Sequence, residues 1–252
     1  MKKIGLTILT IIIPSLVYAN EPMEFTTFPK ADGAVNVVSS SKMSVSSEQL
    51  IKEKNEMQTK GYVEKENPEI KELLTIKRTA EYEIKNFKNI EKIRNNPNKN
   101  TMQFPQYGSV YVDTHIKASY KEIKLAFPYK EIPMQEGSTI IGYAAIGEWH
   151  DGWTGINVFF ENKDLGICSY ELNNMAISHG AVNISEDVAR YDINKMPNTL
   201  LVEGSTKSGF LYRINFFDSQ FSKSLECAKT KFDKSTTNKL IGFAKVLDNT
   251  QA

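Results

Sequence analysis

The amino-acid sequence predicts an α+β fold, with an N-terminal helical hairpin followed by an antiparallel β-sheet domain with a C-terminal helix. Three observations support this prediction. Apolar residues recur every three or four positions in the charged region 47–98, residues 107–227 alternate apolar and polar positions between turn signals, and 236–248 is again amphipathic. We therefore expect a helical region at 47–98 and a β-rich domain at 99–252.

The composition is that of a globular protein. The 252 residues include 31 Lys and Arg, 30 Asp and Glu, and 3 His, which gives a formal net charge of +1. Forty per cent of the residues are apolar and 24% are charged, which excludes collagen, a fully disordered chain and a polytopic membrane protein. A nucleic-acid-binding domain would show a marked basic excess, so we expect no nucleic-acid partner.

Residues 1–19 have the pattern of a secretory signal peptide. Lys2 and Lys3 precede an apolar stretch, Ile4 to Val17, and small residues before Asn20 predict cleavage after Ala19. Fourteen residues would span only about 21 Å as a helix, less than the ~30 Å hydrocarbon core of a membrane. We expect a soluble periplasmic or secreted protein with 29 basic and 30 acidic residues, because cleavage removes two lysines and no acid.

Residues 20–46 lack helical periodicity and contain Ser, Pro and Gly. We predict a flexible tail here. The alternative is an extended arm that pairs with a partner, because three valines give a weak strand signal at 35–38.

Two helices are predicted in the charged region. Ser46 and Gln49 can cap the first, which ends near Gly61. The second begins at Asn67-Pro68-Glu69, where Asn can cap, Pro fits the first helical position and Glu suits the helix dipole. Its apolar stripe is predicted to face a partner, the next domain or another helix, and consists of Leu73, Ile76, Ile84, Phe87 and Ile90. A coiled-coil seam is less well supported, because a strict heptad places Glu83 at a core position.

In the β-rich region the clearest signal is Asp151-Gly152 between two alternating segments, which predicts a hairpin with a type I′ turn. That register places His150 opposite Trp153, and Gly147 opposite Ile156. Six further strands are predicted at 166–172, 181–184, 188–193, 199–203, 210–217 and 221–227.

Two cysteines occur in the chain, Cys168 and Cys227. In an oxidising compartment they permit one intramolecular disulfide. Each shares a strand face with apolar residues, so we predict a bridge buried between strands. The alternative, a catalytic thiol assisted by His150 or His179, has no nucleophile signature around either cysteine.

The best candidate binding site is the hexapeptide at the predicted turn. Its aromatic, acidic and imidazole side chains could bind a partner protein or a glycan, and they are Glu148, Trp149, His150, Asp151 and Trp153. Glu148 and His150 could supply two metal ligands, but a site needs three or four, so we predict no metal and no cofactor. Phosphate-loop, dinucleotide-binding and zinc-protease motifs do not occur in the sequence.

These features lead to a functional hypothesis, which is a non-enzymatic binding or assembly component of a bacterial envelope complex such as a secretion or conjugation apparatus. The alternative is a periplasmic or secreted hydrolase of cell-wall or peptide substrates, with its site near Glu148, His150 and Asp151. A third possibility is a small-ligand binder with a cavity inside the sheet.

Overall fold

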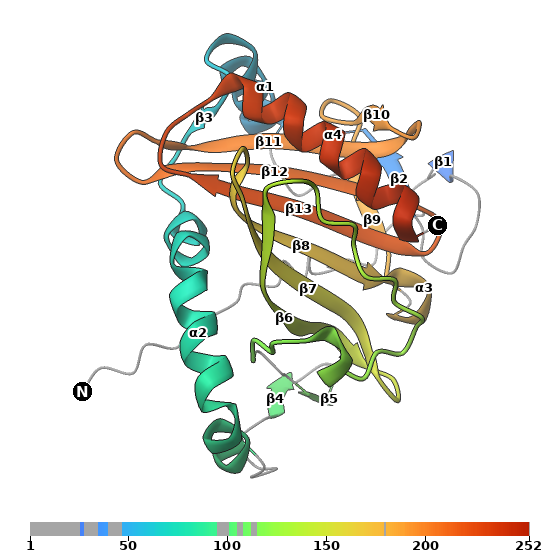
Figure 1. Ribbon diagram of the computed structural model, residues 1–252. Helices are drawn as coiled ribbons and strands as arrows, with labels where there is room; N and C mark the ends of the chain where they lie inside the picture. The colour runs from blue at the N-terminus through green and yellow to red at the C-terminus, as the bar shows by residue number, and fades with distance from the viewer. Residues whose placement is uncertain are drawn as a thin grey trace.

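The computed structural model describes residues 26–27, 35–39, 47–94, 101–104, 108–111, 115–178 and 180–251. Its centre is an eight-stranded sheet in which seven strands follow the order β10-β11-β12-β13-β8-β7-β6 and β3 pairs with β11 (Figure 1). All neighbours are antiparallel except β3 and β11. Together with α4, the C-terminal helix, this confirms the predicted α+β class.

Most strands lie where the alternation pattern predicts them. The strands of the main sheet are β3 (Val63–Glu64), β6 (Ser138–Trp149), β7 (Trp153–Asn162), β8 (Gly166–Asn174), β10 (Arg190–Ile193), β11 (Met196–Ser205), β12 (Gly209–Phe217) and β13 (Phe221–Lys229). The smaller strands are β1 (Thr26–Thr27), β2 (Val35–Val38), β4 (Thr101–Phe104), β5 (Gly108–Tyr111) and β9 (Val182–Ser185). The helices are α1 (Ser47–Thr59), α2 (Pro68–Arg94), α3 (Met175–Ser178) and α4 (Lys234–Gln251), with a short 3₁₀ turn, η2, at Tyr120–Glu122.

The two faces of the sheet are covered by different helices (Figure 1). Along β12, Tyr212 and Ile214 belong to the main core with α4, whereas Leu211 packs with α2. Successive side chains of a strand point to opposite faces, so α4 and α2 lie on opposite sides of the sheet. Residues 120–134 also cover the α4 side, where they contribute Ile123, Phe127 and Ile132 to the main core.

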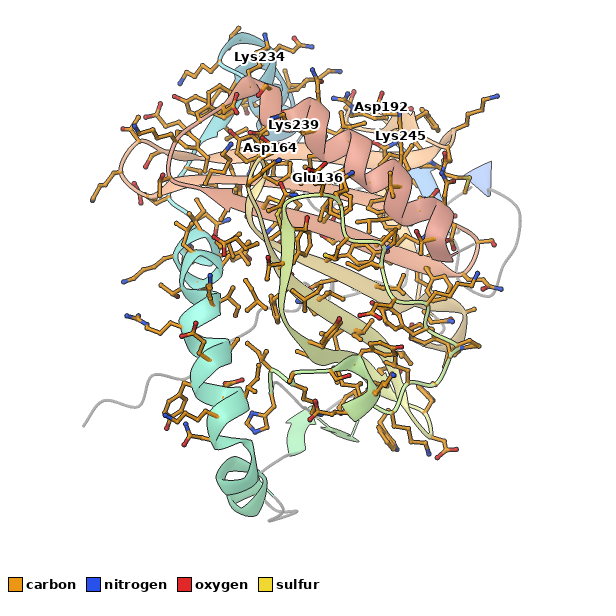
Figure 2. All side chains as sticks on the ribbon, viewed as in Figure 1. Glu136, Asp164, Asp192, Lys234, Lys239 and Lys245 are labelled. Carbon is orange, nitrogen blue, oxygen red and sulfur yellow. A yellow bond between two sulfur atoms is a disulfide. The ribbon has the colours of Figure 1, made fainter. Side chains whose placement is uncertain are left out.

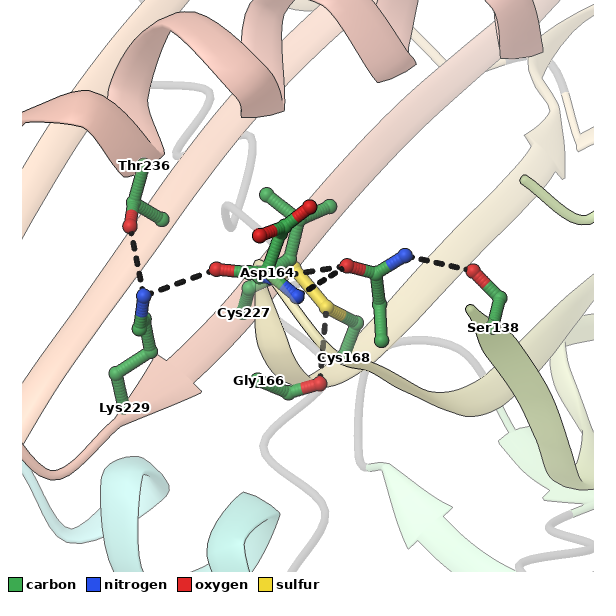
Figure 3. The surroundings of a disulfide bond; sticks show 9 residues. Ser138, Asp164, Gly166, Cys168, Cys227, Lys229 and Thr236 are labelled. Carbon is green, nitrogen blue, oxygen red and sulfur yellow. Dashed lines mark hydrogen bonds between the residues drawn. A yellow bond between two sulfur atoms is a disulfide. The ribbon is translucent and has the colours of Figure 1, made fainter. Parts of the chain in front are cut away.

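Cys168 and Cys227 form the predicted disulfide, with an S–S distance of 2.10 Å. They are direct neighbours on β8 and β13, and both are fully buried in the main core. Beside the bridge, the ammonium group of Lys229 donates to the carbonyl oxygen of Asp164 (2.9 Å) and to the hydroxyl of Thr236 (3.0 Å), as Figure 3 shows. The bridge and Lys229 together connect β8, β13 and the start of α4.

Part of the predicted flexible tail is ordered structure. Residues 35–38 form β2, which pairs in parallel with β9 and antiparallel with β1. Val35 and Val38 are buried, and Val35 belongs to a small core that is separate from the main one. For these residues the prediction of a flexible tail is wrong, because a strand 147 positions away supplies the pairing that local sequence lacks.

The β6–β7 hairpin is present, but its register differs from the prediction. Trp149, not His150, is opposite Trp153, and Ala145, not Gly147, is opposite Ile156. Only Asp151 of the turn has a left-handed φ (53°), whereas a type I′ turn requires this at both central residues. The loop is therefore three residues long, and the ladder is irregular between Ile146 and Trp149. The register is therefore shifted by one residue at the tip and by two residues beyond the irregularity. Both faces of the hairpin are buried further along, where Ala145 and Ile156 belong to the main core and Ala144 and Phe159 pack on the α2 side.

Residues 115–117 lie within the alternating region 107–227, but in the described structure they form no strand. Ile116 is buried against α2, and its neighbour Lys117 makes a single bridge to Tyr143 of β6. The predicted signal peptide and His179 lie outside the described residues. Across the described ranges, none of the helices is both long and apolar enough to span a membrane.

Candidate functional site

The tip of the β6–β7 hairpin presents an exposed aromatic side chain. Trp149 is 41% exposed, whereas Trp153 is 8% exposed and packs edge-on against it with a ring-centroid distance of 5.6 Å. The ammonium group of Lys124 lies 5.8 Å from the centre of the Trp149 ring. Trp149 is thus held between a buried ring and a cation while much of its surface faces solvent.

The charged residues of the tip form two separate pairs. The imidazole Nε2 of His150 lies 2.9 Å from Oε2 of Glu148, and both side chains are about half exposed. Asp151 instead pairs with Lys124, at 2.6 Å, and this hydrogen bond lowers the pKa of Asp151. Of the three groups in the hydrolase hypothesis, the structure therefore brings together two, while Asp151 contacts a residue outside the hexapeptide.

The tip is fixed in place by residues 124–126. The N–H of Trp153 donates to the carbonyl of Lys124 (2.8 Å), and its carbonyl accepts from the N–H of Ala126 (2.9 Å). Gly152 permits this close approach, because a Cβ at that position would lie 2.6 Å from the backbone nitrogen of Ala126. The hexapeptide is therefore a braced corner of the fold and not a free loop.

The first half of the predicted α2 stripe contacts the protein's own sheet. Leu73 and Ile76 are each 7% exposed and pack with Phe159 and Leu211. Of the alternatives given for the stripe, these two residues therefore follow packing against the next domain and do not face a separate partner. Phe87 and Ile90 lie on α2, but their side chains are outside the described part of the structure.

Where α2 reaches the edge of the sheet, a groove of about 380 Å³ opens between α2 and β6. Ile84, which is half-buried, lines it together with Ile140 and Ile141 of β6. The remaining lining residues are Lys77, Glu81, Lys85, Thr139 and Glu161. Among the stripe residues whose side chains are described, Ile84 is thus the one that lines this groove.

A cluster of charged residues on the α2 side of the sheet is not evident from the sequence. Arg213 of β12 pairs with Glu69 of α2 and with Glu226 of β13, and its Nη1 lies 3.8 Å from Glu203. These three acids come from three different elements, α2, β11 and β13, so no sequence motif identifies them. The only local signal is Arg213 itself, the one charged residue of a strand that is mostly apolar and aromatic.

Glu171 lies one strand beyond this cluster. Its carboxylate accepts a hydrogen bond from Asn157 (3.1 Å), whose own oxygen accepts one from the hydroxyl of Ser169 (2.8 Å). Burial, and to a lesser extent the negative charge of Glu226, raise the pKa of Glu171 to about 7. Glu171 therefore changes its charge near neutral pH while it is held on the sheet.

We expect the substitution Glu171→Gln to remove a pH dependence of stability. The folded protein binds this proton more tightly than the unfolded chain, whose pKa is near 4.5. The stabilisation that comes from proton binding at Glu171 is fully present below pH 4.5, and it is lost progressively as the pH rises from 4.5 to about 7. Urea unfolding at pH 5 and pH 8 should show that the variant gains about 1–3 kcal/mol relative to the native protein over this interval. The exposed Glu186→Gln is the control, and equal pH slopes for native protein and Glu171→Gln would contradict the assignment.

Among the described residues, no group of three or more His, Cys, Asp or Glu side chains is arranged to hold a metal ion. Comparisons with known proteins add no assignment. No protein-family model, curated protein or solved structure matches this chain.

Proposed function

We propose that this protein is an exported, non-enzymatic binding component of a bacterial envelope complex, such as a secretion or conjugation apparatus, and that it contacts its partner through the β6–β7 tip. The main observation behind the proposal is that Trp149 is exposed while its ring packs against Trp153 and lies beside the ammonium group of Lys124. Tryptophan is enriched among the residues that dominate binding energies at protein interfaces. A side chain that is already held in place loses less conformational entropy when a partner covers it.

The rest of the fold suits such a role. The tip projects from a sheet that is braced by a buried disulfide and by helices on both faces. A disulfide of this kind persists in oxidising compartments, which supports a periplasmic or secreted location.

The proposal predicts that Trp149→Ala reduces partner binding by at least tenfold without loss of fold. The test is chemical crosslinking of the purified mature protein to envelope extracts of the source bacterium, with quantification of each crosslinked species. Tyr191→Ala is the matched control, because Tyr191 is also an exposed aromatic residue (49%) but lies on β10 at the opposite edge of the sheet. Crosslinked species that disappear in Trp149→Ala and persist in Tyr191→Ala support the proposal. Identical crosslinking of all three proteins overturns it.

A further inference from the structure

Strand β9 pairs with β2, a segment that is distant from it in the sequence. Residues 35–38 pair with 182–185 in parallel register, and Asn36 donates a side-chain hydrogen bond to Asn183 (3.1 Å). At the end of the ladder the N–H of Glu186 donates to the carbonyl of Val38 (2.9 Å). This contact is a strand-docking site with a defined register.

The docking site has an apolar floor. Val35 (6% exposed) packs in one cluster with Ile184, Met175 and Phe217, which are each 5% exposed or less. Within the described residues, β9 has no strand neighbour except β2. If β2 leaves, β9 becomes a strand edge without a partner on that side, and Ile184 is exposed. Such an edge favours pairing with another strand.

The docked segment, or arm, belongs to a small sheet of its own. Eight residues separate Val38 from Ser47 of α1, and within the described residues β2 pairs only with β1 and β9 and with no strand of the main sheet. The arm can therefore leave β9 and return without disturbing the main sheet. Its four-residue parallel ladder is also the kind of small element that opens locally under native conditions.

We infer that the β9 edge also binds residues 35–38 of a second copy of this chain, so that two copies exchange arms and form a closed dimer. The contacts made in exchange are those already seen within one copy, and a reciprocal exchange satisfies both β9 edges. The eight-residue connection could reach roughly 28 Å when extended. This inference concerns contacts between copies and does not depend on the partner surface at Trp149.

Concentration decides between the two arrangements. An arm on a short connection has an effective concentration in the millimolar range at its own β9 edge. The closed monomer should thus dominate at micromolar concentration, and exchange should become extensive near 1 mM or where an assembly holds copies side by side.

The test uses two full-length mature proteins that differ in mass by a tag, one with Asn36→Cys and the other with Asn183→Cys. These residues are direct partners in the ladder, and the native cysteines are already bonded to each other. After mixing and oxidation at about 1 mM, we expect tens of per cent of the chains as the mixed disulfide dimer, falling at least tenfold at about 10 µM.

Three controls make the result specific. Asn36→Cys mixed with Thr206→Cys, an exposed position in the β11–β12 turn, should give no mixed dimer above background. Adding Val35→Asp to the Asn36→Cys copy should abolish the mixed dimer, because it places a charge against the apolar floor. A single chain with both Asn36→Cys and Asn183→Cys should close internally at low concentration.

Closure within one chain without a mixed dimer at 1 mM would overturn the exchange. If neither the internal disulfide nor the mixed dimer formed, residues 35–38 would not dock on β9 at all. Neither outcome bears on partner binding through Trp149, which the crosslinking of Trp149→Ala tests separately.

Discussion

Loss of the Cys168–Cys227 bridge is expected to lower the free energy of unfolding by about 4 kcal/mol, because the bridge closes a loop of 59 residues in the unfolded chain. For a protein of this size the corresponding fall in melting temperature is about 10 °C. Thermal and urea unfolding of the Cys168→Ala/Cys227→Ala variant, compared with the native protein, measures both quantities.

The native protein after reduction is the control for this experiment, because it loses the bridge while it retains both sulfur atoms in the core. It should unfold close to the double variant. Native protein should also release no free thiol before unfolding, since both sulfurs are fully buried and bonded to each other. Unchanged melting after complete reduction would contradict the predicted contribution of the bridge.

The second large effect is expected at Lys223. Its side chain is fully buried beside Phe216, where the ammonium group pairs with Asp218 and, at 2.6 Å, with Asp248 of α4. Lys223→Met would leave the 10% exposed carboxylate of Asp248 without its cation. Removing one member of a buried ion pair typically costs 3–5 kcal/mol, and we expect a loss in that range in urea unfolding.

Lys239→Met is the matched control. Lys239 also pairs with an aspartate, Asp164, at 2.8 Å, but both side chains are nearly half exposed, and Figure 2 shows the pair beside α4. An exposed pair contributes 1 kcal/mol or less. Adding Asp248→Asn to Lys223→Met should recover part of the loss, since the uncompensated charge is removed while a polar group remains near Asn194. Equal losses for Lys223→Met and Lys239→Met would show that burial does not strengthen this pair.

The sequence predicts the elements of this fold well, because periodicity is a local property. Alternation locates β8, β12 and β13 to within two residues, and the Asn67-Pro68-Glu69 signal marks the start of α2. The disulfide follows from having two cysteines on apolar strand faces. The predicted register of the β6–β7 hairpin is wrong by one residue at the tip, because the loop has a third residue, and by two residues beyond the irregularity between Ile146 and Trp149. The backbone hydrogen bonds that hold Trp153 to residues 124–126 are not evident from the local sequence.

The candidate sites, like the fold, are predictable from the sequence only where they depend on neighbouring residues. The composition of the tip identifies Trp149 as a surface of interest, yet its bracing by Lys124 comes from a segment 25 positions away. The ion pairs of Arg213 and the raised pKa of Glu171 need strands that are neighbours only in the folded sheet. The pairing of Val35 and Val38 with β9 likewise depends on a strand that is distant in the sequence.

Local patterning was therefore sufficient for the class of the fold, the order along the chain of the strands from β6 to β13 and the pairing of the two cysteines. Strand order within the sheet, the face that α2 covers and the partners of every buried charge arose only on folding. The physical reason is that the periodicity of a helix or strand is set by residues close together in the sequence. Burial and electrostatic pairing instead depend on which distant segments the sheet brings into contact.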